Sequence, residues 1–428
     1  MKALSVILLV MLIITQGLLA QEEMGRYRNE DVPEFYYDII NVASSETGKS
    51  RINLYFEIPY DELQFVRTDS SYIAKYELTV VVYDKDGEQV DGKIWEEAIE
   101  VTNYSLTNSR KNYSLTNTFF HLDPDDIRVS IGLMDLDTQK TGFRKTRLDL
   151  RDFSDQKFAV SDVTFTDQLE IDSLGIKSIH PQVADYIRAT GSQLFCYFEI
   201  YSTDTKKNQA FDISYTLTDS KKHEVLKESY LRRRDSSRTM EYFAIDRSVL
   251  THGRYTLEVD VKQGRREDKV KKAFILRWAG APSTVSDLTL AIQQLRYIAK
   301  NSELKELMKA PEDEKLDNFK EFWQKRDPSP GTEKNELMNE YYRRIEYANE
   351  NFSGFREGWI SDMGMIYIIF GPPSDIERHP FEREYKPYEI WYYYHINRQF
   401  VFVDESGFGD YRLSNPYNWR NWQDGIYY

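Results

Sequence analysis

Along the first two thirds of the chain, apolar and polar residues alternate in short runs that turn residues separate. Residues 52–58 and 74–83 are rich in β-branched and aromatic side chains, and residues 127–131 alternate apolar with polar. Residues 84–87 read DKDG, a turn whose glycine can adopt a positive φ. No long helical stripe interrupts these runs, so the pattern predicts antiparallel β-sandwiches.

Three segments of this strand pattern return later in the chain in the same order. They are residues 54–58 with 196–200, 76–84 with 211–219, and 128–133 with 254–259. We therefore predict two tandem antiparallel β-sandwich domains of Ig-like type, at residues 24–150 and 155–279.

After about residue 283 the spacing of apolar residues changes to three and four, which predicts helices. Three stripes follow this spacing: Leu288, Ile292, Leu295 and Ile298; Leu316, Phe319, Phe322 and Trp323; and Leu337, Tyr341, Ile345 and Ala348. Residues 365–370 are apolar on both faces, which favours a central strand. Residues 389–394 and 399–403 flank a short polar segment typical of a hairpin. For residues 283–428 we predict an α+β domain of about three helices and a small antiparallel sheet.

Four motifs in this last region resemble one known family. They are GWISD at residues 358–362, YIIFGPP at 367–373, YEIW at 388–391 and FVFVDESGFGD at 400–410. Over about residues 285–415 the chain is similar to the bacterial GWxTD domain family. Ser361 stands where the family name has threonine, and its hydroxyl keeps a capping role open. The resemblance implies an export signal and β-rich segments ahead of the domain, and it implies no assigned reaction.

The N-terminus has the features of a signal peptide at residues 1–20. Lys2 precedes an apolar run at residues 6–14, and Ala20 offers a small residue for cleavage. The alternative is an anchor that is never cut. The lone cysteine, Cys196, excludes an internal disulfide, which favours a bacterial envelope over a eukaryotic secretory route. We expect an exported protein, located in the periplasm or at the cell surface of a bacterium.

The formal net charge of −14 argues against nucleic acid and against an anionic membrane surface as the main partner. The histidines are scattered, and no zinc, calcium or phosphate-loop motif is present, so we expect no metal and no cofactor. The two prolines at 372 and 373 remove the backbone N–H groups that a phosphate loop needs.

Two carboxylates near the conspicuous turns, Asp362 and Asp375, are the catalytic candidates. A pair of carboxylates could perform general acid–base chemistry on a glycoside. The alternative is that Ser361, Asp362 and Asp375 cap turns by binding backbone amides, as short polar side chains at turns do.

Aromatic residues are the remaining feature of the last domain. In a strand, two of residues 391–394 should face outward, where aromatic side chains suit protein or glycan contact. The alternative is that they pack beneath the helices. The candidate binding or structural residues are Gly358, Trp359, Ser361, Asp362, Gly371, Pro372, Pro373, Trp391 and Trp419.

The sequence thus predicts an exported, non-catalytic cell-envelope protein whose last domain binds a protein or a glycan. The alternative is an envelope hydrolase acting on glycan or peptide with carboxylates near Asp362. Residues 358–362 would form the joint between helices and sheet.

Overall fold

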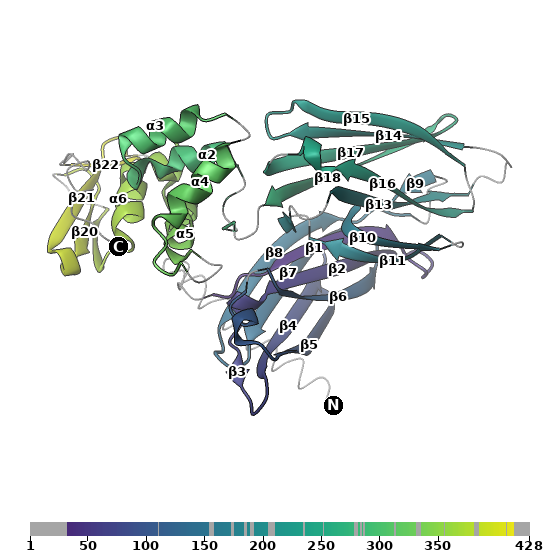
Figure 1. Ribbon diagram of the computed structural model, residues 1–428, viewed down its shortest axis with the longest axis horizontal. Coiled ribbons are helices and arrows are strands. Elements are labelled where there is room, and N and C mark those ends of the chain that lie inside the picture. Colours follow the sequence, from purple (N-terminus) through teal and green to yellow (C-terminus); the bar gives the residue numbers. More distant parts are fainter. Residues whose placement is uncertain are drawn as a thin grey trace.

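The computed structural model describes residues 32–414, with short gaps inside that range. The gaps lie at residues 110, 154–157, 173–174, 184–185, 189–191, 204–209, 234–235, 251, 278–280, 283–284, 286, 312–313, 331–334, 355, 381–384 and 408. The predicted signal peptide at residues 1–20 and the candidate Trp419 lie outside the described residues. Within them the chain is mostly β-sheet, with several antiparallel sheets followed by five α-helices and a last sheet (Figure 1).

The first unit consists of two facing sheets, purple and blue in Figure 1. One has the order β1-β2-β6, from Tyr36–Ala43, Ser50–Pro59 and Tyr113–Leu122. The other has β3 (Val66–Arg67), β4 (Tyr72–Tyr83), β5 (Gln89–Val101), β7 (Asp126–Asp135) and β8 (Thr141–Asp149). Alternate residues of β2 and β4, such as Leu54 and Leu78, meet in one apolar cluster between the sheets. The period-two pattern thus places one face of each sheet in the core.

The second unit, teal in Figure 1, also has two sheets around one apolar cluster. One sheet contains β9 (Phe158–Val160), β10 (Thr164–Asp172), β11 (Gly175–Gln182), β13 (Gln193–Ser202) and β16 (Arg238–Asp246). The other has the order β12-β18-β17-β14-β15, from Ile187–Arg188, Arg266–Arg277, Gly253–Gln263, Ala210–Asp219 and Glu224–Arg233.

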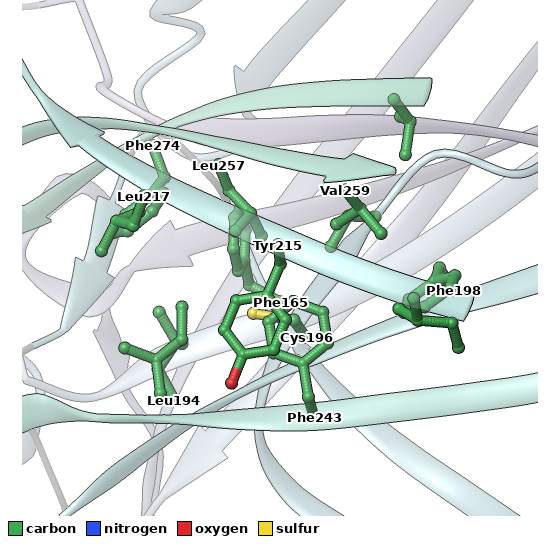
Figure 2. Packing of buried hydrophobic residues seen from close by; sticks show 14 of the residues in the cluster. Phe165, Leu194, Cys196, Phe198, Tyr215, Leu217, Phe243, Leu257, Val259 and Phe274 are labelled. Carbon is green, nitrogen blue, oxygen red and sulfur yellow. The ribbon is translucent and has the colours of Figure 1, made fainter. Parts of the chain in front are cut away.

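Cys196 lies inside the second cluster. Figure 2 shows its sulfur among the rings of Phe165, Tyr215 and Phe243. The side chain is fully buried, and burial raises the pKa of its thiol well above the ordinary value. A thiol in this environment packs as a small apolar group and is a poor nucleophile.

The repeat in the sequence is also a repeat of strand pairing. The matched segments lie in β2, β4 and β7 of the first unit and in β13, β14 and β17 of the second. In the first unit β2 pairs with β6 and β4 with β7; in the second, β13 pairs with β16 and β14 with β17. Equivalent sequences therefore occupy strands with equivalent partners, although the second unit has the further strands β11 and β12 at the edges of its sheets.

Buried charges hold these two units together. Arg188 donates to both carboxylate oxygens of Glu57, at 2.7 and 2.6 Å, and Glu57 is only 1% exposed. Lys272 pairs with the buried Asp38 at 2.5 Å. The rings of Tyr36 and Tyr186 stack beside them, 4.3 Å between centroids. Charges can be buried in this way because each is paired and hydrogen-bonded.

The C-terminal region, green and yellow in Figure 1, contains helices and a small sheet. The helices are α2 (Leu288–Gln294), α3 (Asn301–Lys309), α4 (Lys315–Gln324), α5 (Glu336–Phe352) and α6 (Asp362–Phe370). The sheet has the order β19-β20-β21-β22, from Asp375–His379, Tyr388–Tyr393, Arg398–Asp404 and Tyr411–Leu413. The predicted hairpin is confirmed as β20 and β21, joined through Asn397 at φ 51°.

Two predictions for this region were wrong. The described residues hold five α-helices where about three were expected. Residues 365–370 belong to helix α6 and not to a central strand. An apolar run of this length fits a buried helix as well as a buried strand. The decisive signals were Ser361, which caps the helix start, and Gly371, which ends the helix at φ 76°.

Helix α6 is central because both halves of this region pack on it. Ile368 and Ile369 contribute to the apolar cluster of the other helices. Met363, Ile366 and Tyr367 contribute to a second cluster with Trp391, Tyr393, Phe400 and Phe402 of the sheet. The helix is therefore buried on nearly all sides, which explains why its sequence lacks a polar face.

Candidate functional site

Residues 358–362 form the joint between helices α5 and α6. A Cβ on Gly358 would overlap the backbone of Ala348 and Asn349 in α5. A Cβ on Gly364, in the first turn of α6, would overlap the carbonyl of Gly358. Both positions need glycine because backbone meets backbone there.

The side chain of Ser361 closes this joint. Its hydroxyl accepts the N–H of Gly364 at 3.0 Å and donates to the carbonyl of Gly358 at 2.7 Å. It is thus the N-cap of α6. A threonine hydroxyl could make the same two bonds, so the departure from the family motif keeps the chemistry of the position.

Trp359 anchors the joint to the helices on either side. Its backbone N–H donates to the Asn349 side chain of α5 at 3.0 Å, and its carbonyl accepts the hydroxyl of Tyr297 at 2.9 Å. Its indole N–H donates to Glu357. The ring is 5% exposed, so it contributes packing and not an open contact surface.

The other end of α6 is fixed by an arginine that the sequence did not single out for this role. Arg344 of α5 donates to the carbonyls of Ile368 and Ile369, at 3.2 and 3.4 Å, where helix carbonyls lack internal partners. The hydroxyl of Tyr393 donates to the carbonyl of Gly371 at 2.8 Å. Pro372 and Pro373 then lead the chain out toward β19, Pro372 exposed and Pro373 half-buried.

The two catalytic candidates have separate structural partners. Asp362 accepts the backbone N–H of Leu413 at 2.9 Å, which ties the first turn of α6 to strand β22. Asp375 accepts the N–H of Ile376 at 2.9 Å, at the exposed start of β19. The structure therefore gives each carboxylate its own backbone contact and does not bring the two together as an acid–base pair.

A cleft of about 460 Å³ lies where the end of α5, the joint and the last sheet meet. Its volume is in the range of small-ligand sites. Aromatic side chains line its base: Tyr347, Phe352, Tyr367, Trp391 and Tyr411. Three arginines and two acids also line it: Arg356, Arg378, Arg412, Glu389 and Asp410.

The candidate Trp391 is 2% exposed, and its ring packs 5.4 Å from Phe352 and 4.9 Å from Phe402. The outward residues of the segment are its neighbours Tyr392 and Tyr394, as the alternation of a strand requires. Trp391 thus forms the base of the cleft and exposes little of itself.

The charges of the cleft are arranged in pairs, with one exception. Arg378 contacts Glu389 at 3.1 Å, and Arg412 contacts Asp410 at 2.7 Å. Arg356 is exposed, and no ion pair is found for it among the described residues. Burial and the Glu389 carboxylate raise the pKa of Tyr411, so its hydroxyl remains a donor at neutral pH.

The FVFVDESGFGD motif builds one wall of this cleft. The carboxylate of Asp404 accepts the backbone N–H groups of Ser406, Gly407 and Gly409, at 2.7 to 3.2 Å. Burial alone would raise the pKa of Asp404, but these donors hold it below its ordinary value. The resulting tight loop, with positive φ at both glycines, places Asp410 at the cleft.

Sequence reasoning found the motif residues but missed the cleft. Ser361, Pro373 and Trp391 line it, whereas Gly358, Trp359, Asp362, Gly371 and Pro372 are not among the described lining residues. The arginines at 356, 378 and 412 gave no signal because they are far apart in sequence and belong to no motif with a known spacing.

In the described part of the chain, no three His, Cys, Asp or Glu side chains gather as a metal site requires. No helix in that part is long and apolar enough to cross a membrane.

Comparison with known proteins identifies the C-terminal region. Residues 253–421 match the family model described as the GWxTD domain, so the match begins at β17 of the second unit. No curated protein matches the chain.

Solved structures give only weak likeness. Red sea bream transglutaminase is 9% identical over 60% of this chain and 33% of its own, with a TM-score of 0.18. Bacteroides uniformis β-glucuronidase 2 is 8% identical over 53% and 26%, with a TM-score of 0.20. A putative β-galactosidase from Bacteroides fragilis is 10% identical over 55% and 33%, also at 0.20. The matches thus span a quarter to a third of those chains, and TM-scores this low support no inference about function.

Proposed function

Because the chain carries a GWxTD domain at its C-terminal end, we propose that this region is the binding part of an exported, non-catalytic cell-envelope protein. The two β-units ahead of it would be Ig-like sandwich domains that act as a spacer. Residues 1–20 would direct export, to the periplasm or the cell surface. The partner would be a protein or a glycan, and the cleft at the α5–α6 joint would be where it binds.

The cleft carries this proposal. Aromatic side chains and arginine, which dominate contact energies at protein interfaces, converge there from α5, α6 and the sheet. The base is apolar and the rim carries both signs of charge, so an apolar side chain of the partner would enter while its charged neighbours meet the rim. Arg356, exposed and outside any ion pair of the described residues, would donate hydrogen bonds to an acidic group of the partner. We therefore favour a protein segment as the occupant of the cleft.

The residues beneath the cleft are held in fixed positions, which suits a binding site. Its base is fixed from below by α6, which is held at one end by Ser361 and at the other by Arg344. Burial alone would raise the pKa of Glu340, but Arg343 and Arg344 hold it below its ordinary value and keep this carboxylate charged beside the C-terminal end of α6. A surface fixed before the partner arrives loses less entropy on binding.

The hydrolase alternative has one observation in its favour, namely that Glu389 and Asp410 line the same cleft. Each of these carboxylates is held in an ion pair, Glu389 with Arg378 and Asp410 with Arg412. Asp362, the residue the alternative named, is bound to the backbone of Leu413. A hydrolase with this cleft would lose its activity on envelope glycan or peptide in the Glu389→Gln variant.

Site-directed photocrosslinking in intact cells tests the proposal. A photoreactive phenylalanine derivative would replace Tyr411 in the cleft or, as the matched control, Tyr104, which is 69% exposed on the first unit. We expect a discrete crosslinked protein from position 411 only, and an at least tenfold lower yield (about 1.4 kcal/mol) when Arg356→Glu is added. Equal products from both positions, or a yield that Arg356→Glu leaves unchanged, would exclude the cleft as the binding site.

A further inference from the structure

The last sheet has a second face, opposite the helices, that differs in chemistry from the cleft. The register places Trp391, Tyr393, Phe400 and Phe402 on the inner face against α6. The alternate residues Tyr388, Ile390 and Tyr392 of β20 therefore lie on the outer face, and Tyr394 follows them. None of these four belongs to a hydrophobic cluster of the described residues.

Aromatic rings follow one another along β20 on this outer face. The rings of Tyr392 and Tyr394 are within 21° of parallel, with centroids 5.9 Å apart. At the other end of the strand, the ring of Tyr388 stacks on His379 at 4.3 Å and 10°. From Tyr388 to Tyr392 the strand extends over roughly 13 Å, at about 3.3 Å per residue, and Tyr394 follows just beyond its end. Tyr394 is 65% exposed, so the strip is open at that end.

Carboxylates of the neighbouring strand β19 border the tyrosines. The hydroxyl of Tyr392 donates to Glu377 at 2.9 Å, and that of Tyr394 lies 3.5 Å from Asp375. His379 contacts the other oxygen of Glu377 at 2.8 Å. The hydrogen bonds from Tyr392 and His379 hold the pKa of Glu377 below its ordinary value, so the group is an acceptor at neutral pH.

The charges of this face exclude several classes of partner. Its described acids, Asp375 and Glu377, would repel phosphate, sulfate or uronate groups. Arg378 lies on the inner face of the sheet and lines the cleft, and Arg412 of β22, opposite Val403, is paired with Asp410 at 2.7 Å. The strip has flat rings and carboxylate acceptors. This combination fits a ligand with apolar C–H faces and many hydroxyl donors, which is the chemistry of a neutral polysaccharide.

We propose that the outer face of the β19–β22 sheet binds a neutral glycan, with Tyr392 and Tyr394 stacking on successive sugar rings and Asp375 and Glu377 accepting sugar hydroxyls. This site is separate from the cleft and does not depend on what the cleft binds. A protein with both sites would attach a protein partner to a glycan surface.

Affinity electrophoresis of the full chain tests this site. The probes are gels containing a neutral β-glucan, xylan or galactomannan, with polygalacturonate as the anionic comparison. We expect retardation by at least one neutral polysaccharide and none by polygalacturonate. The double variant Tyr392→Ala/Tyr394→Ala should weaken binding at least about tenfold (about 1.4 kcal/mol), since it removes both stacking rings.

Three further variants distinguish stacking on these two rings from a loss of folding and from binding elsewhere on the chain. Tyr392→Phe/Tyr394→Phe keeps the rings and should retain most of the retardation, which also shows that the strip still folds. Tyr104→Ala, at an exposed position of the first unit, and Leu231→Ala, at an exposed position of the second, should bind as the unaltered chain does. The proposal is overturned if no neutral polysaccharide retards the chain, if polygalacturonate alone does, or if the double alanine variant is retarded equally.

Discussion

The molecule is held together by two joints of opposite chemistry. Between the β-units, long charged side chains meet in pairs, as Arg188 and Glu57 do. Between α5 and α6, backbone meets backbone at Gly358 and Gly364, and the short side chain of Ser361 closes the contact. The interface between the β-units is filled by side chains. At the α5–α6 joint the backbones are in direct contact, and the aromatic side chains beside this contact line the cleft. A paired joint can be rebuilt with other side chains; a backbone joint cannot.

The largest effect is expected from Gly358→Ala. The added Cβ overlaps the carbonyl of Ala348, which belongs to the helix backbone and cannot move aside. We expect a loss of about 4 kcal/mol or more in the free energy of unfolding of the C-terminal region, measured by urea unfolding with limited proteolysis. The control is Gly354→Ala, because a Cβ there meets nothing within 4 Å. Similar stability of the two variants would contradict the backbone contact.

Arg188→Ala should cost about 3–5 kcal/mol because it leaves the carboxylate of Glu57 buried without its cation. The double variant Arg188→Leu/Glu57→Leu should recover most of that loss, since apolar side chains can replace a buried ion pair. The control Lys325→Ala breaks an exposed ion pair with Glu321 and should cost less than about 0.5 kcal/mol. If the double variant is no more stable than Arg188→Ala, the contrast between the two joints is wrong.

Substitution of Ser361, at the α5–α6 joint, should cost less stability than the two changes above. Ser361→Ala removes the N-cap of α6 and the bond to Gly358, for a loss of about 1–2 kcal/mol. Ser361→Thr keeps the hydroxyl and should stay within about 0.5 kcal/mol of the unaltered chain. Chemical unfolding monitored by tryptophan fluorescence compares the two. A threonine variant as unstable as the alanine variant would show that the hydroxyl is not what holds the joint.

The smallest effect concerns His252, where the second unit approaches α4. Burial and Lys320 of α4 lower the pKa of His252 to about 4. The unfolded chain takes up a proton near pH 6.5 and the folded chain only near 4, so the folded form loses stability as the pH falls across this window. Because the ring is half-exposed, the loss should be about 1 kcal/mol or less.

The melting temperature between pH 7 and pH 4 measures this contribution of His252. In the His252→Phe variant the melting temperature should fall less between pH 7 and pH 4 than in the unaltered chain. His395→Phe, at an exposed position of the β20–β21 turn, should leave the dependence of the melting temperature on pH unchanged. A profile that His252→Phe does not alter would show that the histidine is protonated equally in both states.

The strands of the β-units could be predicted from sequence because a sheet with one buried face has apolar and polar residues in alternation along each strand. Residues 52–58 and 196–200 lie in β2 and β13, as the alternation and the repeat predicted. Helix α6 could not be recognised by period, since it is buried on nearly all sides and its apolar run matches a strand equally well. The residues that indicate a helix here are Ser361 at its start and Gly371 at its end.

The cleft could not be predicted for a different reason. Its arginines come from the loop after α5, from β19 and from β22, and only the packing of α6 brings them together. The motif of residues 358–362 was expected to join the helices to the sheet, but it lies between helices α5 and α6, because residues 365–370 are helical. Ser361 alone of those five residues is among the described lining residues of the cleft.

The short parallel ladder between β12 and β18 sets the order in which the molecule can assemble. It pairs Arg188, near the beginning of the second unit, with Arg277 at its end. Arg188 binds Glu57 of the first unit, and Arg277 donates to the carbonyls of Pro282 and Val285 on the way to α2. Since β12 has no other strand partner among the described residues, it can dock only after β18 has been synthesised. Pairings between segments this distant in sequence form slowly, so we expect this ladder, which links a contact of the first unit to one on the way to α2, to form late in folding.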